Sequence, residues 1–167
     1  MLSIVLTGLK EGRQLFSSHL GKEFFESFDN TEVLDADLLV KAAAWKSEGC
    51  TMIDCSIAGT ITVQCDRCLD DLVLKVDETH LLRVKAGSEE EVPADDDGRE
   101  TVFISPEDDV FDLSQTVYDY SLLALPLHRV HPEGECNPQV VKHLSKEAAK
   151  EHSDSPFAAL KGLLDKK

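Results

Sequence analysis

Three long segments in the first half of the chain alternate apolar and polar residues with a period of two. They cover residues 36–44, 50–65 and 71–84. Strict alternation is typical of an antiparallel strand that has one face in the core and the other in water. Short turn-like stretches join the segments into a meander, and their length favours a curled sheet or an open barrel. The small residues AGT at 58–60 predict a bend or bulge in the middle segment.

The other predicted elements are shorter. Strands are expected at 3–8 and 101–105, and helices at 21–28 and 112–125. The second helix has an apolar stripe with helical spacing and stops before a proline. The sequence therefore predicts a β-rich α+β fold, in which a long antiparallel meander is accompanied by a few short flanking helices.

The chain shows no internal repeat and no obvious linker. We expect a single β-rich domain over residues 1–138 and a helical C-terminal tail over residues 139–167. The stretch 87–100 carries a run of acidic residues with a proline and two glycines. Such a run is typical of a solvated loop.

The charge of the chain is strongly negative. Seventeen Lys and Arg residues stand against thirty-two Asp and Glu residues, which leaves a formal net charge of −15. Such a surface repels phosphate backbones and argues against tight non-specific nucleic-acid binding through a basic face. Because opposite fields steer encounter, a basic protein or cationic peptide is the electrostatically favoured partner. The alternative is that the charge only keeps the protein soluble.

The apolar runs are short. The longest ones, such as YSLLALPL, fall short of the roughly 18 to 20 residues that span a bilayer. The N-terminal run reads as a strand rather than a signal peptide, so we expect a cytoplasmic protein without a membrane anchor. Common catalytic and phosphate-binding motifs do not occur. His80 lies on the apolar face of a strand pattern, where we expect a hydrogen-bonded core histidine.

The cysteines favour reduced thiols or metal ligands over a disulfide framework, because they are five in number and no secretory context accompanies them. Cys65 and Cys68 form a C-x-x-C pair, which can supply two of the four ligands that zinc needs. Cys136 with His131 or His128 can supply the others. The alternative is that Cys65 completes a buried strand face and Cys68 lies in the turn. A redox role is disfavoured, since the pair lies between two strands and beside aspartates.

Arg67 lies between the two thiols and is one of few cations in this chain. It can lock the turn by pairing with Asp66, Asp70 or Asp71. It can instead reach a phosphate or carboxylate of a partner through two parallel hydrogen bonds.

The stretch GTITVQCDRCLDDL resembles the hallmark of the YceD family, in which an apolar strand leads into C-x-R-C-L. GLKEG, EFFESF and FDLSQTVYDYSLLALPLHRVHPEGEC resemble the flanking blocks of that family, so the likeness covers residues 1–138. The SPFAALKGL stretch in the tail resembles the ending of one bacterial branch.

This resemblance implies a non-enzymatic role in the accumulation of large-subunit ribosomal RNA, and hence in biogenesis of the large ribosomal subunit. The expected partner is a large-subunit precursor, contacted through a basic ribosomal protein or the RNA itself, with no small-molecule substrate. Four residues match the hallmark and are therefore the expected binding residues: Cys65, Arg67, Cys68 and Leu69. The alternative function is a zinc-stabilised protein-interaction module. Zinc is then the possible cofactor, and its ligands are Cys65, Cys68, Cys136 and His131.

Overall fold

The structure is a computed structural model that describes residues 2–9, 12–47, 49–87 and 98–148. In chain order the elements are β1 (Ser3–Val5), β2 (Gln14–Leu20), α1 (Lys22–Glu26), β3 (Val33–Ser47), β4 (Cys50–Gln64), β5 (Asp71–Ala86), β6 (Glu100–Ile104), β7 (Val110–Asp112), α2 (Ser114–Leu123) and α3 (Pro138–Ala148).

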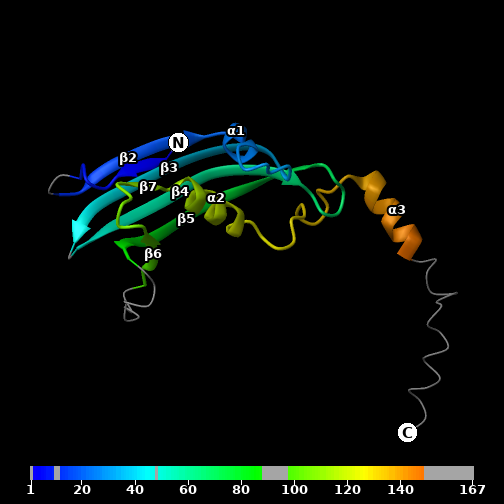
Figure 1. The fold of residues 1–167 in the computed structure, drawn as a ribbon. Coiled ribbons are helices and arrows are strands. Elements are labelled where there is room, and N and C mark those ends of the chain that lie inside the picture. Colours follow the sequence, from blue (N-terminus) through cyan, green and yellow to red (C-terminus); the bar gives the residue numbers. More distant parts are fainter. Residues whose placement is uncertain (1, 10–11, 48, 88–97, 149–167) are drawn as a thin grey trace, which may run out of the picture.

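The body of the protein is a five-stranded sheet in the order β2-β3-β4-β5-β6 (Figure 1). Strands β2 to β5 pair antiparallel, and β6 pairs parallel with β5. The predicted meander is therefore confirmed as β3, β4 and β5. The sheet does not close, which agrees with the predicted curled sheet or open barrel. The β-rich α+β class is also confirmed.

The period of two places one face of the sheet in the core. Along β4 the side chains of Ile53, Cys55 and Ile57 are fully buried, and those between them are half-buried. Helix α2 lies over this face (Figure 1) and adds Val117 to the same core, while α1 adds Phe25. Most side chains on the opposite face of the sheet stay at least partly exposed.

The sequence pattern does not predict β2. In its segment QLFSSHL two apolar residues, Leu15 and Phe16, stand side by side, which interrupts the period of two. β2 nevertheless pairs with β3 along its full length. It forms because β3 offers it a complete ladder of backbone partners, although Leu15 remains 81% exposed.

Gly59 lies in the stretch 58–60, where a bend or bulge is predicted. The register between β3 and β4 runs through Gly59 without a shift, so the prediction of a bulge there is wrong. The register shift in this strand pair lies between Val33 and Asp35. Gly59 has a φ of +151°, and a Cβ atom on it would overlap the backbone oxygen of Asp37. A glycine is needed there because the two strand backbones approach closely.

The predicted helix at 112–125 forms as α2 and begins at Ser114, because Asp112 belongs to β7, which pairs antiparallel with β1. The predicted strands at 3–8 and 101–105 correspond to β1 and β6. No helix in the described ranges is long and apolar enough to cross a membrane.

The expected division of the chain at residue 138 stays a prediction. Helix α3 begins there and projects from the end of the sheet (Figure 1). The predicted acidic loop lies outside the described residues over 88–97, and so does the tail over 149–167.

Candidate metal centre

The C-x-x-C pair lies in a tight turn at the end of β4. The Cys65 N–H donates to the Asp70 oxygen at 2.9 Å, and the Leu69 N–H donates to the Cys65 oxygen at 2.9 Å. Leu69 takes a left-handed conformation, with a φ of 63°, to close the turn. As a result the side chains of Cys65 and Cys68 are both buried, while Leu69 remains 67% exposed.

A segment from much later in the chain is fastened to this turn. The Asp66 N–H donates to the Arg129 oxygen at 2.7 Å, and the Arg129 N–H donates to a carboxylate oxygen of Asp66 at 2.7 Å. The Arg129 guanidinium also pairs with Glu32 at 3.0 Å. These bonds bring His131 and Cys136 to the two thiols.

The result is a compact group of four side chains, which we call the Cys/His cluster: Cys65, Cys68, His131 and Cys136. Their four possible ligand atoms all lie within 4.8 Å of one another. The Sγ atoms of Cys65 and Cys136 are 3.9 Å apart. The Nδ1 atom of His131 lies 3.4 Å from the Sγ of Cys68 and 4.0 Å from the Sγ of Cys136.

These spacings fit a zinc ion. In a tetrahedron with Zn–S bonds of about 2.3 Å and Zn–N bonds of about 2.0 Å, neighbouring sulfurs lie about 3.8 Å apart and a sulfur and nitrogen about 3.5 Å apart. The Cys65–Cys136 and Cys68–His131 separations of 3.9 and 3.4 Å are close to these values, whereas the Cys136–His131 separation of 4.0 Å is longer. Zinc would serve here to hold the turn and the later segment together, as structural sites do.

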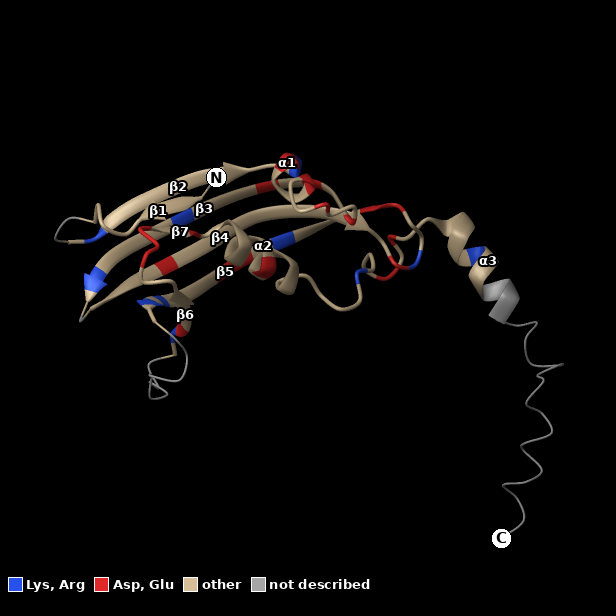
Figure 2. Ribbon diagram, in the orientation of Figure 1, with Lys and Arg blue, Asp and Glu red and all other residues tan. Residues whose placement is uncertain are grey.

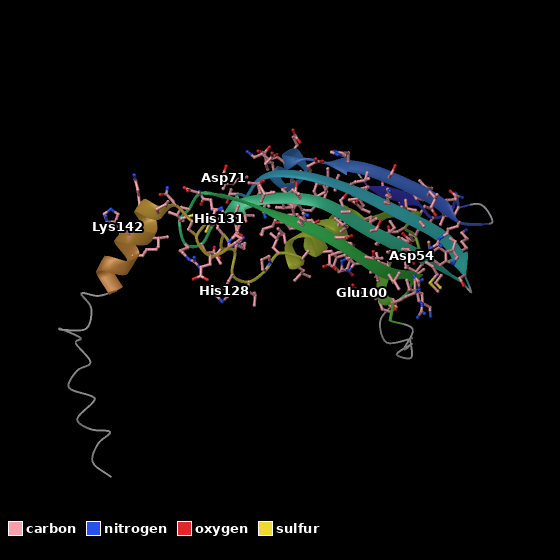
Figure 3. The ribbon with its side chains drawn as sticks, turned by 180° about the vertical axis from the view of Figure 1, so that it is seen from behind. Asp54, Asp71, Glu100, His128, His131 and Lys142 are labelled. Atoms are coloured by element: carbon pink, nitrogen blue, oxygen red, sulfur yellow. The ribbon has the colours of Figure 1, made fainter. Side chains whose placement is uncertain are left out.

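His131 is oriented for this role. Its Nε2 atom lies 3.1 Å from the backbone oxygen of Asp71, and its Nδ1 atom faces the thiols. A ring N–H that donates to a carbonyl leaves the other nitrogen free as a ligand. Of the two histidines that the sequence leaves open, the structure brings His131 to the thiols, whereas His128 is exposed and lies apart (Figure 3).

The cluster shifts the pKa values of its own members. Burial alone would raise the pKa of Cys65, but hydrogen bonds from the backbone of Cys68, His131 and Arg67 lower it to about 6. The Cys65 sulfur also raises the pKa of His131 through a hydrogen bond. Burial, followed by the neighbouring thiols, raises the pKa of Cys136. Without metal, the cluster therefore favours one thiolate held by donors.

Arg67 contacts the cluster and not the aspartates of its own turn. Its Nη1 atom lies 3.7 Å from the Sγ of Cys136. Within the described ranges no ion pair joins Arg67 to Asp66, Asp70 or Asp71, and Asp66 is bonded to Arg129 instead. A site with three thiolates and one Zn²⁺ carries a net negative charge, which the guanidinium is placed to offset.

His80 lies outside the cluster. Its ring stacks on that of Tyr120, with centroids 3.4 Å apart and planes at 6°. Its Nε2 atom is buried and has no hydrogen-bond partner among the described residues. The expectation of a fully hydrogen-bonded core histidine is therefore wrong, although its packing is structural.

Two parts of the site have no signal in the sequence. The Asp71 contact to His131 comes from a backbone oxygen, which every residue has. The link between Asp66 and Arg129 joins segments whose proximity depends on the whole sheet. Only the presence of the thiols and histidines could be read from the chain.

A family model described as large ribosomal RNA subunit accumulation protein YceD matches residues 53–164. The match covers more than half of the chain and includes the whole Cys/His cluster. The chain belongs to the YceD family. No match was found among curated proteins or among solved structures.

The YceD match confirms the family that the hallmark residues indicate. Its range, residues 53–164, differs from the range 1–138 over which the sequence resembles that family. It begins within β4, so residues 1–52 lie outside it, and it continues through the tail to residue 164. The YceD name implies a role in accumulation of large-subunit ribosomal RNA and a link to the large ribosomal subunit.

Proposed function

We propose that this protein is a non-enzymatic factor in biogenesis of the large ribosomal subunit, and that it supports accumulation of the subunit's RNA by binding a basic ribosomal protein. The observation that carries the role is membership of the YceD family, over a range that contains the Cys/His cluster. The choice of a basic protein as partner is supported by the charge around that cluster.

Acidic residues gather at the end of the sheet that holds the Cys/His cluster (Figure 2). Two arginines lie there, and one of them, Arg129, is already paired with Glu32. We call this surface the acidic end; its exposed carboxylates are Glu32, Asp66, Asp70, Asp71, Glu133 and Glu135. Such a field attracts Lys- and Arg-rich surfaces and repels other anions.

The apolar member of the hallmark also belongs to this surface. Leu69 is 67% exposed and is held in a left-handed conformation by the turn. A leucine in that conformation costs about 1 kcal/mol or more, and such strain tends to persist where a site uses it. Leu69 would give the partner an apolar contact in the same turn as the exposed carboxylates of Asp66 and Asp70.

A non-enzymatic role is consistent with the number of ligands in the cluster. Structural zinc sites have four protein ligands, whereas catalytic sites keep a position for water or substrate. The Cys/His cluster supplies four.

The second candidate function is a zinc-stabilised protein-interaction module, and the observation that favours it is the spacing within the Cys/His cluster. Elemental analysis of the purified chain tests it. We expect one zinc per chain in the wild type and a loss of that zinc in Cys68→Ser, with Cys50→Ser as the matched control outside the cluster. Equal metal content in the two variants would contradict a zinc site.

The main proposal is tested by deleting the gene and fractionating ribosomes on a sucrose gradient. We expect fewer mature large subunits, less large-subunit RNA relative to small-subunit RNA, and co-sedimentation of the tagged protein with large-subunit precursors. Normal gradients with no ribosomal association would contradict the proposal. Salt added to purified precursor complexes should release the protein, because exposed charge pairs are screened.

A further inference from the structure

A second constellation lies at the other end of the sheet, on the face opposite the core. It surrounds a depression of about 550 Å³ that is lined by Gly12 and by four charged residues and one aromatic residue, which we call the Trp45 cluster: Arg13, Trp45, Lys46, Asp54 and Arg99. In the sheet register Trp45 lies opposite Met52, near the start of β4. The C-x-x-C turn begins where β4 ends, about 40 Å away along the strand.

Two guanidinium groups stand over the tryptophan ring. The Cζ atom of Arg13 lies 4.5 Å from the ring centroid of Trp45, and that of Arg99 lies 5.3 Å from it. Cation–π contacts of this kind favour tryptophan over the other aromatic residues.

The two arginines that pair with Asp54 differ in how far their side chains are exposed. Asp54 pairs with both, and the Arg99 Nη1 lies 2.9 Å from one of its carboxylate oxygens. The side chain of Arg99 is 16% exposed, so its position is set by packing. The side chain of Arg13 is 56% exposed and can turn toward a ligand at little cost.

The lining of the depression carries more cations than carboxylates. It has three cations and one carboxylate, against a formal net charge of −15 for the whole protein. In Figure 2 blue Lys and Arg segments of the ribbon lie at this end of the sheet, beside a few red acidic ones.

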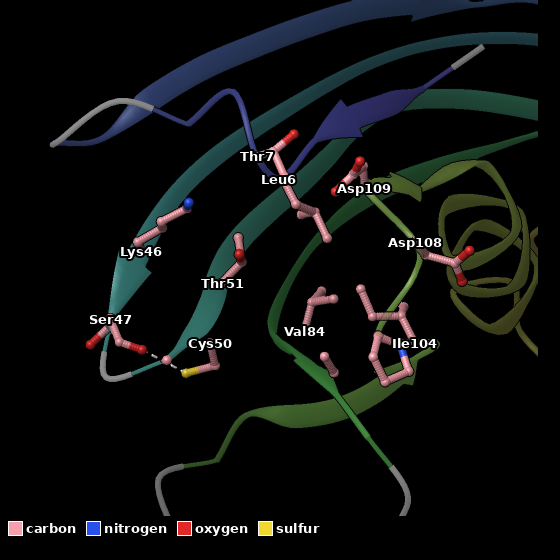
Figure 4. Close-up of a pocket in the computed structure, with 13 residues that line it drawn as sticks. Leu6, Thr7, Lys46, Ser47, Cys50, Thr51, Val84, Ile104, Asp108 and Asp109 are labelled. Atoms are coloured by element: carbon pink, nitrogen blue, oxygen red, sulfur yellow. Dashed lines mark hydrogen bonds between the residues drawn. The ribbon is translucent and has the colours of Figure 1, made fainter.

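A neighbouring pocket of about 430 Å³ lacks this chemistry. Lys46 lines it as well, but two aspartates, Asp108 and Asp109, also line it (Figure 4). The thiol of Cys50 in that pocket donates to the Ser47 oxygen at 2.8 Å. An anion would therefore meet two carboxylates there, and the Trp45 cluster is the better anion site.

We infer that the Trp45 cluster binds a single-stranded RNA segment. A base stacks at Trp45, and Arg13, with Lys46 at the rim, contacts the flanking phosphates. Proteins bind single-stranded nucleic acids with an aromatic ring beside guanidinium groups, since every base has a π-face and every linkage a negative charge. The choice of RNA among polyanions rests on the proposed function.

The two ends of the protein would then have different partners. The acidic end repels RNA and attracts a basic protein, whereas the Trp45 cluster accepts RNA locally. This arrangement sets the orientation of the chain on a ribonucleoprotein, because turning it around would place like charges together.

Trp45 is the only tryptophan in the chain, so its emission reports on this site alone. We would titrate the full-length protein with a twelve-nucleotide uridine RNA at 50 and 200 mM salt. We expect saturable quenching, and an affinity about tenfold weaker at the higher salt if two or three phosphates are contacted. Absence of quenching at the lower salt would overturn the inference.

Charge variants locate the contact. Arg13→Gln is expected to weaken RNA binding about threefold to tenfold and to reduce the salt dependence by about one phosphate contact. Lys75→Gln removes the same charge from an exposed position on β5, opposite Thr60, and is expected to leave the affinity unchanged. Equal affinities for the two variants would contradict the assignment.

The aromatic contribution separates RNA from other anions. Trp45→Ala, followed by the anisotropy of labelled RNA, should weaken binding at least fivefold, which is the lower limit for one stacked base. A poly-glutamate peptide that binds wild type as tightly as the RNA would show an acidic-peptide site and overturn the inference. These measurements use purified protein, so they do not depend on subunit profiles; normal profiles would count against the proposed function alone.

Discussion

The Nε2 atom of His131 lies 3.1 Å from the backbone oxygen of Asp71, the first residue of β5. The strand that follows the C-x-x-C turn therefore orients a histidine that comes sixty residues later. This contact leaves Nδ1 of His131 facing the sulfur of Cys68 at 3.4 Å. The turn, the strand and the later segment thus form one unit around the Cys/His cluster.

The first prediction concerns the choice between the two histidines. We expect His131→Ala to weaken zinc binding at least a hundredfold, since it removes one of the four ligands and no fifth donor joins the Cys/His cluster among the described residues. His128→Ala is the matched control, because His128 is exposed and outside the cluster. Competition against a chromogenic zinc chelator measures both, and equal affinities would show that His131 is not a ligand.

The second prediction concerns Leu69, which has a φ of 63°. We expect Leu69→Gly to raise the free energy of unfolding or leave it unchanged, because relief of about 1 kcal/mol of backbone strain offsets the flexibility of glycine. We expect the same variant to bind large-subunit precursors less well. Urea denaturation and co-sedimentation measure the two effects. A variant that is clearly less stable would show that Leu69 packs in the turn.

The third prediction concerns Gly59, where a Cβ atom would overlap the backbone of Asp37. We expect Gly59→Ala to lower the free energy of unfolding by about 3 kcal/mol or more, because the central pair β3–β4 must separate to admit the methyl group. Gly49→Ala is the control: Gly49 has a φ of +82° but open space around it. That variant should cost about 1 kcal/mol. Equal losses in urea denaturation would mean that the clash is relieved locally.

The fourth prediction concerns the pH dependence of stability. Burial lowers the pKa of His80 below 6.5, although Glu78 and Glu100 act in the opposite direction. The unfolded chain then binds the proton more readily than the folded one, so the free energy of unfolding falls as the pH drops below about 6.5. His80→Phe keeps a ring against Tyr120 and removes this titration.

Urea denaturation at pH 7.5 and 5.5 measures the effect. We expect the wild type to lose more stability between these two values than His80→Phe does, since all other titrating groups are common to both. The same loss in both proteins would contradict a role for His80.

Much of the fold could be predicted from the chain because the relevant signals are local. The period of two in β3, β4 and β5 reflects alternate burial along a single strand, and it needs no knowledge of the neighbours. The edge strand β2 and the parallel pairing of β6 could not be predicted in the same way. They depend on the backbone that β3 and β5 offer, which is a property of the assembled sheet.

The same difference between local and non-local signals applies to the Cys/His cluster and the Trp45 cluster. The C-x-x-C turn, the thiol and imidazole donors and the family could be predicted from the chain, because they depend on residue type and short spacing. The folded structure was needed to show that His131 and not His128 faces the thiols, and that Arg13 and Arg99 meet over Trp45. Such distances are set by how the strands pair and how later segments pack against them, and neither leaves a periodic pattern along the chain.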